Sequence, residues 1–476
     1  MVLIVHVLIA ALIIGAEVWS LKRLARVTAK SALCSLPEIV HQTSSSLKLA
    51  GHGLFLSGLV ASAIGMVSGY AMWLTLGATS LCLVVRLGVM QLAVAEAKRC
   101  QLPRYLQALR HPKIRRARMA LYFSEPRLAM PYQVTMWLKP LLSLNEPFVI
   151  ILKERKHLRH FPKSDLLEVL VVEDFPSQTA FLPSNIEVLF YVNNSMSNLP
   201  VIAANPKVTH VQLLHGDSDK PPSYNPMSVI YDHLFVAGEM AIDRYARHGV
   251  HIPREKFRIV GRPQITLSKQ TRPKDPTRKT ILYMTTWEGM FEDSNFCSLS
   301  QAHNILHQVF HSSLKVDVIF KPHPLTFKDA KWPEVSTRIE QTAQDLPEGV
   351  AYRMAHTEED PMTLYAEADL LISDISSTVI DFLATEKPFI VTNPRGYTKK
   401  QLEAYPSVSA GYLASADAQN LRELLDECFA GDPMTENRRC IKEYALGNAA
   451  HSNGALFKMA CEEALSKSCR CLPLAM

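Results

Sequence analysis

The chain has 476 residues, of which 48% are hydrophobic and 20% are charged, and it carries a formal net charge of +6. At roughly 150 residues per domain, this length predicts about three structural units, and the apolar content favours a globular protein with an added membrane portion. The small net charge does not favour nucleic acid as a partner.

Residues 1–98 are predicted to form a membrane anchor of about three transmembrane helices. Met1–Trp19 contains no lysine or arginine, so it lacks the positive start of a signal peptide, and its length suits one span. Gly53–Ala97 is apolar over about twice the length of a span, interrupted only by Arg86 and Glu96. Two further helices would account for this stretch, and a re-entrant hairpin is the alternative.

Basic residues cluster after the first and the last of these apolar stretches. Lys22, Arg23, Arg26 and Lys30 follow the first, and residues 99–119 form a basic juxtamembrane segment. The positive-inside rule places both clusters in the cytoplasm, so we expect a multi-pass protein of the cell membrane with cytoplasmic catalytic domains. The basic segment can also bind anionic membrane lipids. The nine cysteines show no zinc-like spacing, which agrees with reduced thiols in a cytoplasmic portion.

From about residue 120 the sequence alternates apolar strands with helices, the pattern of an α/β protein. In a first series, a helix is expected at 239–248 and buried strands at 148–152, 167–172, 186–192, 208–214, 231–236 and 257–260. After a linker at 270–278, a second series has expected strands at 281–284, 316–320, 370–372 and 389–391 and helices at 300–311, 421–429 and 440–466. Two open sheets of this kind bind a ligand in the cleft at the carboxyl ends of their strands.

Polar turns follow several of the predicted strands, and the first contains His215. Gly216 lets the chain turn sharply, and the imidazole at the strand end can act as a base. Asp217 or Asp219 can orient that imidazole, and Lys220 adds a positive charge nearby. A purely structural histidine is the alternative.

Two further turns carry groups suited to a phosphate. Arg262 follows the last strand of the first series and can clamp a phosphate through two hydrogen bonds, or lie at the surface beside the linker. Thr285, Thr286 and Trp287 follow the first strand of the second series. Their hydroxyls can bind phosphate, and the indole can stack on a base or pack in the core.

The turn Lys321-Pro322-His323-Pro324 is the most informative of the set. Each proline fixes its own φ and holds the preceding residue in extended backbone. A lysine and a histidine held rigidly at a strand end suit a pyrophosphate or a developing oxyanion. The sequence contains no acidic metal box, Walker motif or glycine-rich dinucleotide loop, so we expect neither a metal nor a cofactor.

A strand–turn–helix–strand unit follows at 369–393. Ser376 and Ser377 can cap its helix, and a helix amino end with hydroxyls and free N–H groups suits a phosphate. An ordinary capped helix is the alternative. Taken with the basic turns, these serines predict a site for a donor that carries a diphosphate.

The order of these motifs resembles the CDP-glycerol glycerophosphotransferase family of teichoic-acid primases and polymerases. The resemblance covers roughly residues 185–395, and its most specific parts are Lys321–Pro324 and Ser373–Phe382. It implies a GT-B-like pair of Rossmann-like domains that face a cleft, here preceded by the transmembrane region. Residues 120–269 would be the acceptor domain and residues 270–476 the nucleotide-donor domain.

The resemblance also implies a reaction and residues that carry it out. An acceptor hydroxyl on a lipid-linked or cell-surface polymer precursor would attack the β-phosphorus of a CDP-alditol, and CMP would leave. His215 matches the family's presumed base and His323 its His-Pro element, so both are expected to be catalytic. The residues expected to bind the donor and its phosphates are Lys220, Arg262, Thr285, Thr286, Trp287, Lys321, Ser373, Asp374, Ser376, Ser377 and Asp381.

Acidic residues depart from the family pattern at two of the turns. Glu288 stands where the family usually has arginine, and Asp217 and Asp219 put negative charge into the His-Gly turn. Gln264 also stands in a turn that lacks the family's later aspartate. A donor other than CDP-glycerol therefore stays open. The alternatives are a GT-B glycosyltransferase that uses a nucleotide sugar, and a catalytically weak membrane scaffold that binds nucleotide.

Overall fold

The computed structural model describes residues 108–173, 182–265, 275, 277–289, 292–328, 330–447 and 454–470. The chain divides into two units, Met1–Arg110 and His111–Met476, and nearly all described residues belong to the second. The predicted membrane anchor and part of the basic segment lie outside the described residues. Within the described ranges, no helix combines the length and the apolar character that a membrane span requires.

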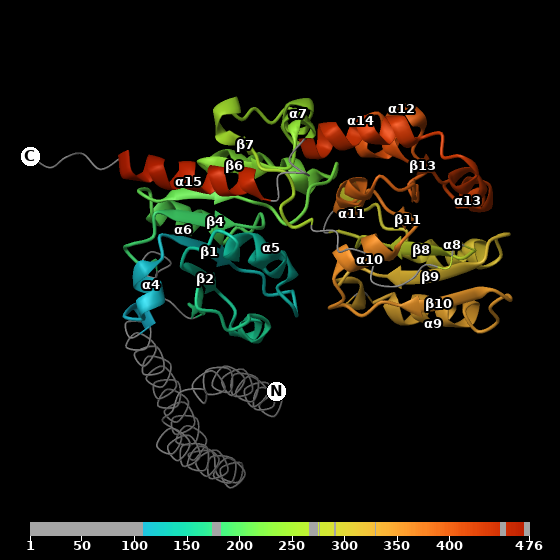
Figure 1. Ribbon diagram of the computed structural model, residues 1–476, viewed down its shortest axis with the longest axis horizontal. Coiled ribbons are helices and arrows are strands. Elements are labelled where there is room, and N and C mark those ends of the chain that lie inside the picture. The colour runs from blue at the N-terminus through green and yellow to red at the C-terminus, as the bar shows by residue number, and fades with distance from the viewer. Residues whose placement is uncertain are drawn as a thin grey trace, which may run out of the picture. The chain divides into compact units, whose positions relative to one another are not determined.

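The first sheet has seven parallel strands in the order β3-β2-β1-β4-β5-β6-β7 (Figure 1). Their bounds are β1 (Met119–Phe123), β2 (Phe148–Leu152), β3 (Leu167–Val171), β4 (Val188–Tyr191), β5 (Thr209–Gln212), β6 (His233–Val236) and β7 (Phe257–Ile259). The six strands expected in this region coincide with β2 to β7. Strand β1 was not predicted, although it lies at the centre and every residue in it is buried.

The second sheet has six parallel strands in the order β10-β9-β8-β11-β12-β13. Their bounds are β8 (Lys279–Met284), β9 (Val316–Lys321), β10 (Val350–Met354), β11 (Leu370–Ser373), β12 (Phe389–Val391) and β13 (Tyr412–Leu413). Counted from its own first strand, this sheet repeats the order of the first six strands of the other, which is the Rossmann order. The expectation of two parallel α/β sheets is confirmed.

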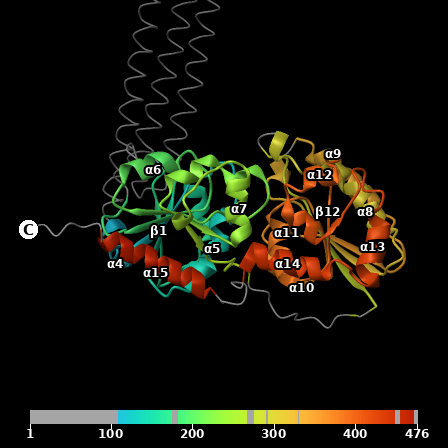
Figure 2. The ribbon, with the colours of Figure 1, turned by 90° about the horizontal axis from the view of Figure 1, so that it is seen from above.

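Helices pack on both sheets (Figure 2). They are α4 (Pro112–Arg116), α5 (Tyr132–Leu142), α6 (Asn198–Ala204), α7 (Glu239–Arg247), α8 (Ala302–Phe310), α9 (Trp332–Thr342), α10 (Pro361–Glu367), α11 (Ser377–Phe382), α12 (Lys399–Leu402), α13 (Leu421–Ala430), α14 (Thr435–Leu446) and α15 (Ala455–Arg470). The helix expected at 440–466 is wrong as one element, because α14 ends at Gly447, whose φ is +59°. A positive φ suits glycine and stops a helix.

Helix α15 returns from the second sheet to the first. Phe457 and Cys461 are buried in the core of the first sheet, and the ring of Phe457 lies 5.5 Å from that of Trp137 on α5. Arg258 of β7 forms two 2.7 Å hydrogen bonds with Glu463 of α15. We therefore call β1–β7 with α4–α7 and α15 the first lobe, and β8–β13 with α8–α14 the second lobe. The predicted boundary near residue 270 lies outside the described residues and stays a prediction.

Candidate active site

His215 follows β5, at the carboxyl edge of the first sheet. Its Nδ1 lies 2.7 Å from the carbonyl oxygen of Val192, which can only accept, so Nδ1 carries the proton and Nε2 presents a lone pair. The turn depends on Leu214, whose φ is +54° and whose carbonyl accepts a 2.8 Å hydrogen bond from the indole of Trp137. A left-handed leucine costs on the order of 1 kcal/mol. The turn is therefore held in place by the core beneath it.

Burial lowers the pKa of His215, although the carbonyl of Val192 opposes the shift. The nearby cations Arg262 and Lys220 lower it further, so the imidazole is neutral near pH 7. A neutral histidine with an unprotonated Nε2 has the form that a general base requires.

His323 follows β9 at the equivalent edge of the second sheet. The N–H of Leu325 donates to its Nδ1 at 3.1 Å, so the neutral ring carries its proton on Nε2. Burial lowers the pKa of His323 to about 3, with smaller contributions from Lys220 and His215. His323 is therefore a neutral hydrogen-bond donor, the opposite tautomer to His215.

Tyr132, the first residue of α5, lies between these two histidines. Its ring meets His215 edge-on at 6.0 Å and His323 edge-on at 5.8 Å between centroids. Its hydroxyl lies 3.4 Å from Nε2 of His323, and Nε2 of the next residue, Gln133, lies 3.4 Å from Nε2 of His215. Burial raises the pKa of Tyr132, so the phenol stays protonated. The two lobes thus bring both predicted catalytic residues around one side chain.

The prediction that Asp217 or Asp219 orients His215 is wrong. Both carboxylates instead bond to Arg244 of α7, Asp219 at 3.0 Å and Asp217 more closely. Asp219 also accepts a 2.9 Å hydrogen bond from the N–H of Ser407 in the second lobe. The buried guanidinium of Arg244 lies between the two acids and balances one of their two negative charges.

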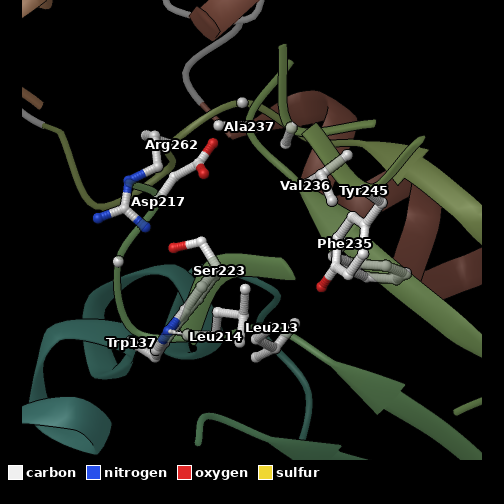
Figure 3. A pocket seen from close by; sticks show the side chains of 13 residues that line it. Trp137, Leu213, Leu214, Asp217, Ser223, Phe235, Val236, Ala237, Tyr245 and Arg262 are labelled. Carbon is white, nitrogen blue, oxygen red and sulfur yellow. Dashed lines mark hydrogen bonds between the residues drawn. The ribbon is translucent and has the colours of Figure 1, made fainter. Parts of the chain in front are cut away.

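The carboxylate of Asp217 and the side chain of Arg262 face a small cavity behind the His215 turn (Figure 3). Trp137, Phe235 and Tyr245 form part of its wall. The volume is about 20 Å³, close to that of one water molecule and far below that of a nucleotide. This cavity supports the turn and does not hold the donor.

Two cations of the first lobe reach the second lobe. Arg262 donates to both carboxylate oxygens of Asp381 at 2.8 and 3.0 Å, and both side chains are buried. The Nζ of Lys220 donates to Oγ1 of Thr286 at 2.7 Å, and burial lowers the pKa of this lysine to about 8, against the attraction of Asp374. The Arg262–Asp381 pair joins the lobes, and the positive charge of Lys220 lowers the pKa of both His215 and His323.

Asp374 is fully buried beneath the second lobe's loops. Its carboxylate accepts hydrogen bonds from the N–H groups of Thr286 (2.7 Å) and Ser298 (3.2 Å) and from the hydroxyl of Thr392 (2.5 Å). Burial raises its pKa and these hydrogen bonds oppose the shift. Ser373 likewise turns inward and donates to the carbonyl of Met284 at 2.9 Å. The structure therefore shows both residues positioning the loops after β8 and β12.

Helix α11 begins at Ser377, directly opposite the His215 turn. Ser376 occupies the N-cap position with extended backbone, and its side chain makes no capping hydrogen bond. A Cβ placed on Gly216 would come within 2.7 Å of Cβ of Ser377, so this approach requires glycine. The glycine permits contact between the lobes, whereas the left-handed residue of the turn is Leu214.

The side chain of Lys321 bonds to the segment after β10 and not to His323. Its Nζ donates to the carbonyls of His356 at 2.8 Å and Thr357 at 3.3 Å, in the segment after β10. Burial lowers its pKa, against the attraction of Glu359 and Asp360. Thr285 is buried with no hydrogen-bond partner for Oγ1 among the described residues.

Trp287 stacks near His323, with 6.3 Å between centroids and 24° between ring planes. It also lines a pocket of about 340 Å³, with Leu325 and Thr326 of the β9 loop and Arg127 of the first lobe. Arg127, Tyr132 and Gln133 belong to the segment after β1, which the sequence did not mark as functional. Its only local signal is the polar run Ser124-Glu125 at a strand end, and that strand was not recognised.

Two Rossmann sheets bring reactive side chains together at the carboxyl ends of their strands, which is the arrangement of a GT-B-like fold. The fold agrees with that of a putative UDP-N-acetylglucosamine 2-epimerase from Listeria monocytogenes, which is 13% identical, with 73% of this chain and 97% of that chain covered and a TM-score of 0.50. The wall teichoic acid polymerase TagF is also 13% identical, with 78% of this chain and 97% of that chain covered and a TM-score of 0.46. No curated protein matches the chain.

Residues 255–437 match the family described as CDP-Glycerol:Poly(glycerophosphate) glycerophosphotransferase. This match agrees with the resemblance over the second lobe and the end of the first. The matched stretch includes His323 and α11 but not His215 or Lys220. The part played by His215 therefore depends on its geometry.

Proposed function

We propose that this protein transfers a glycerol-phosphate or related alditol-phosphate unit from a CDP-activated donor to a hydroxyl of a lipid-linked or cell-surface polymer precursor. One observation carries the proposal: two neutral histidines of opposite tautomers, one from each lobe, face the same tyrosine. One offers a lone pair and the other a proton, which are the two groups that such a transfer uses.

His215 is the general base in this proposal. Its Nε2 takes the proton of the acceptor hydroxyl while that oxygen forms a bond to the β-phosphorus of the donor. The bond between the β-phosphorus and the bridging oxygen breaks, and CMP leaves with the electron pair. The hydrogen bond from Nδ1 to Val192 stabilises the imidazolium that forms, since a carbonyl oxygen favours the charged ring.

His323 and Lys220 stabilise the charge that develops on the donor. The Nε2–H group of His323 can donate to a phosphate oxygen, and the positive charge of Lys220, which lowers the pKa of both histidines, favours an anion at this site. The amino end of α11, with Ser376 and Ser377, completes the proposed diphosphate site. Thr286 takes part through its hydrogen bond to Lys220.

Membrane attachment is a further part of the proposal. It is supported by the apolar residues 1–98 and the basic segment 99–119, which would hold the catalytic lobes at the cytoplasmic leaflet beside a lipid-linked acceptor. Extraction of the full-length chain from membranes by alkaline carbonate would contradict a spanning anchor, whereas resistance to carbonate with release by detergent is expected.

Transfer of label from CDP-glycerol and CDP-ribitol into membrane lipid tests the activity. We expect incorporation by the wild type with stoichiometric release of CMP, and loss of both in His215→Ala. His251→Gln, an exposed histidine between α7 and β7, is the matched control and should retain full activity. Incorporation from UDP- or GDP-sugars in place of either CDP-alditol would instead identify a nucleotide-sugar glycosyltransferase.

A further inference from the structure

The pocket beside Trp287 has the size and lining of a small-molecule site. Its volume of about 340 Å³ lies within the usual range for such sites, roughly 300–1,000 Å³. Trp287, Leu299 and Leu325 supply apolar walls, and Glu288 and Thr326 supply polar groups. The stack of Trp287 on His323 places the pocket directly beside the proposed catalytic residues.

The apolar walls suit a flat aromatic ring. Indole faces stack favourably on nucleobases. Stacking alone does not distinguish one base from another, because every base has a π-face. The selection has to come from the polar groups of the pocket.

Glu288 is held at the pocket by two features. The backbone reverses directly after it at Gly289, whose φ is +81° and whose Cβ, if present, would lie 2.6 Å from Oγ of Ser294. Lys331 donates to Oε1 of Glu288 at 2.9 Å, and among the described residues no hydrogen bond to the second oxygen, Oε2, is seen. An ionised carboxylate accepts hydrogen bonds and cannot donate them.

Thr326 is a second, independent sign of a ligand. Its side chain is only 2% exposed, it lines the pocket, and its Oγ1 has no hydrogen-bond partner among the described residues. A buried hydroxyl without a partner carries a free-energy cost in the folded protein. A ligand with a hydrogen-bonding edge would remove that cost.

We propose that this pocket binds the cytosine ring of the donor and that Glu288 selects cytosine by accepting a hydrogen bond from its 4-amino group. Cytosine carries an amino donor at position 4, where uracil carries a carbonyl oxygen that the carboxylate would repel. Thr326 is assigned to the acceptor edge of the ring. The assignment rests on the proposed function, since that function supplies the cytidine donor, and it gives a role to the acidic residue that departs from the family pattern.

Binding of CMP, UMP and AMP to the purified full-length chain, measured by calorimetry, tests the assignment. The wild type should bind CMP on the order of tenfold more tightly than UMP, as expected for one well-placed base contact, and AMP more weakly than CMP. Glu288→Gln should bind CMP and UMP within about twofold of each other, because an amide offers both an acceptor and a donor. Equal binding of CMP and UMP by the wild type would overturn the assignment, as would a preference that survives in Glu288→Gln.

Two control variants separate the carboxylate from its surroundings. Lys331→Met removes the ion pair but keeps the carboxylate, so the preference for CMP should persist; its loss would show that the pair, and not the base contact, is responsible. Glu334→Gln on α9, where Glu334 pairs with Arg338 at the surface, should behave as the wild type. Thr326→Val should weaken CMP binding several-fold without lowering the melting temperature, and a lowered melting temperature with unchanged binding would count against the assignment.

The outcome of the binding test can be distinguished from the outcome of the transfer assay. A clear preference for CMP with no transfer from any CDP-alditol would keep the pocket assignment and remove the proposed function. Transfer from CDP-glycerol by a protein whose Glu288→Gln variant still prefers CMP would keep the function and remove the assignment.

Discussion

The two histidine turns lie at corresponding edges of two sheets with the same strand order, yet they present opposite tautomers. In the first lobe a backbone carbonyl accepts from Nδ1 of His215, and in the second lobe a backbone N–H donates to Nδ1 of His323. No acidic side chain is needed in either case, and the aspartates beside His215 bond to Arg244 instead. The main chain, rather than a charged neighbour, determines which histidine can accept a proton and which can donate one.

Replacing the accepting histidine should have the largest effect. His215→Gln should lower kcat by about 10³-fold, within the usual range of 10²–10⁴ for general base catalysis, because an amide cannot take up the proton. Initial rates of CMP release, compared with His251→Gln, measure the loss. Near wild-type rates in His215→Gln would show that the two turns do not differ in the way proposed.

The comparison also depends on the ion pair that joins the lobes. Asp381→Ala leaves Arg262 buried without its partner and should lower the free energy of unfolding by about 3–5 kcal/mol. Urea denaturation measures the change. Glu334→Ala, which breaks an exposed pair on α9, should cost no more than about 0.5 kcal/mol and serves as the control.

The donating histidine should respond to replacement in a different pattern. His323→Leu should lower kcat by about 10²-fold, the usual effect of removing one hydrogen-bond donor from a developing anion. His323→Gln should recover a large part of this loss, since its amide N–H can replace the Nε2–H group, whereas His215→Gln recovers nothing. Equal losses in the two His323 variants would remove the donor role.

The free energy of unfolding should decrease as the pH is lowered, because His323 is buried in its neutral form. Its pKa is about 3 in the folded protein against an ordinary 6.5, so the unfolded chain binds the proton first as the pH drops below 6.5. Between pH 7 and pH 5 this histidine alone should remove about 2 kcal/mol from the free energy of unfolding. Urea midpoints at both pH values should show a correspondingly smaller drop in His323→Gln, and an unchanged drop would contradict the buried neutral ring.

The smallest effect on kcat is expected from replacing Tyr132, the tyrosine between the two histidines. Tyr132→Phe removes a hydroxyl 3.4 Å from Nε2 of His323 and keeps both ring contacts, so kcat should fall by about threefold. Tyr132→Leu also removes the edge-on ring contacts, so it should lower kcat further. It should also change how kcat depends on pH on the acid side of its optimum. Identical effects of the two variants would mean that the rings do not help to position the histidines.

Much of the fold was predictable because its signals are local. Apolar runs bounded by polar turns placed β2 to β7, and the reactive turns were found at strand ends. Strand β1 was missed although Met119–Phe123 is wholly apolar, since it directly follows the basic run and was not separated from it. A helix break at Gly447 was missed because a single glycine inside a helical pattern is often tolerated.

The pairing of charges was not predictable, because partners lie far apart in the sequence. Asp217 pairs with Arg244, which lies 27 positions later on a helix. Arg262 pairs with Asp381, and 119 positions separate these two residues. Tyr132 lies 191 positions from His323, and nothing in the segment Pro131-Tyr132-Gln133 distinguishes it from an ordinary helix start. Such residues can be recognised only once the sheets bring their loops together.

The return of α15 to the first lobe sets an order in which the chain can fold during synthesis. The apolar side chains of Trp137 and Phe235 pack against Phe457, which leaves the ribosome only after the whole second lobe. The lobe that is made first is therefore completed last, and it has to keep an apolar surface uncovered while the second lobe is translated. Chaperone dependence of the nascent chain, ending when α15 emerges, is the expected biological consequence.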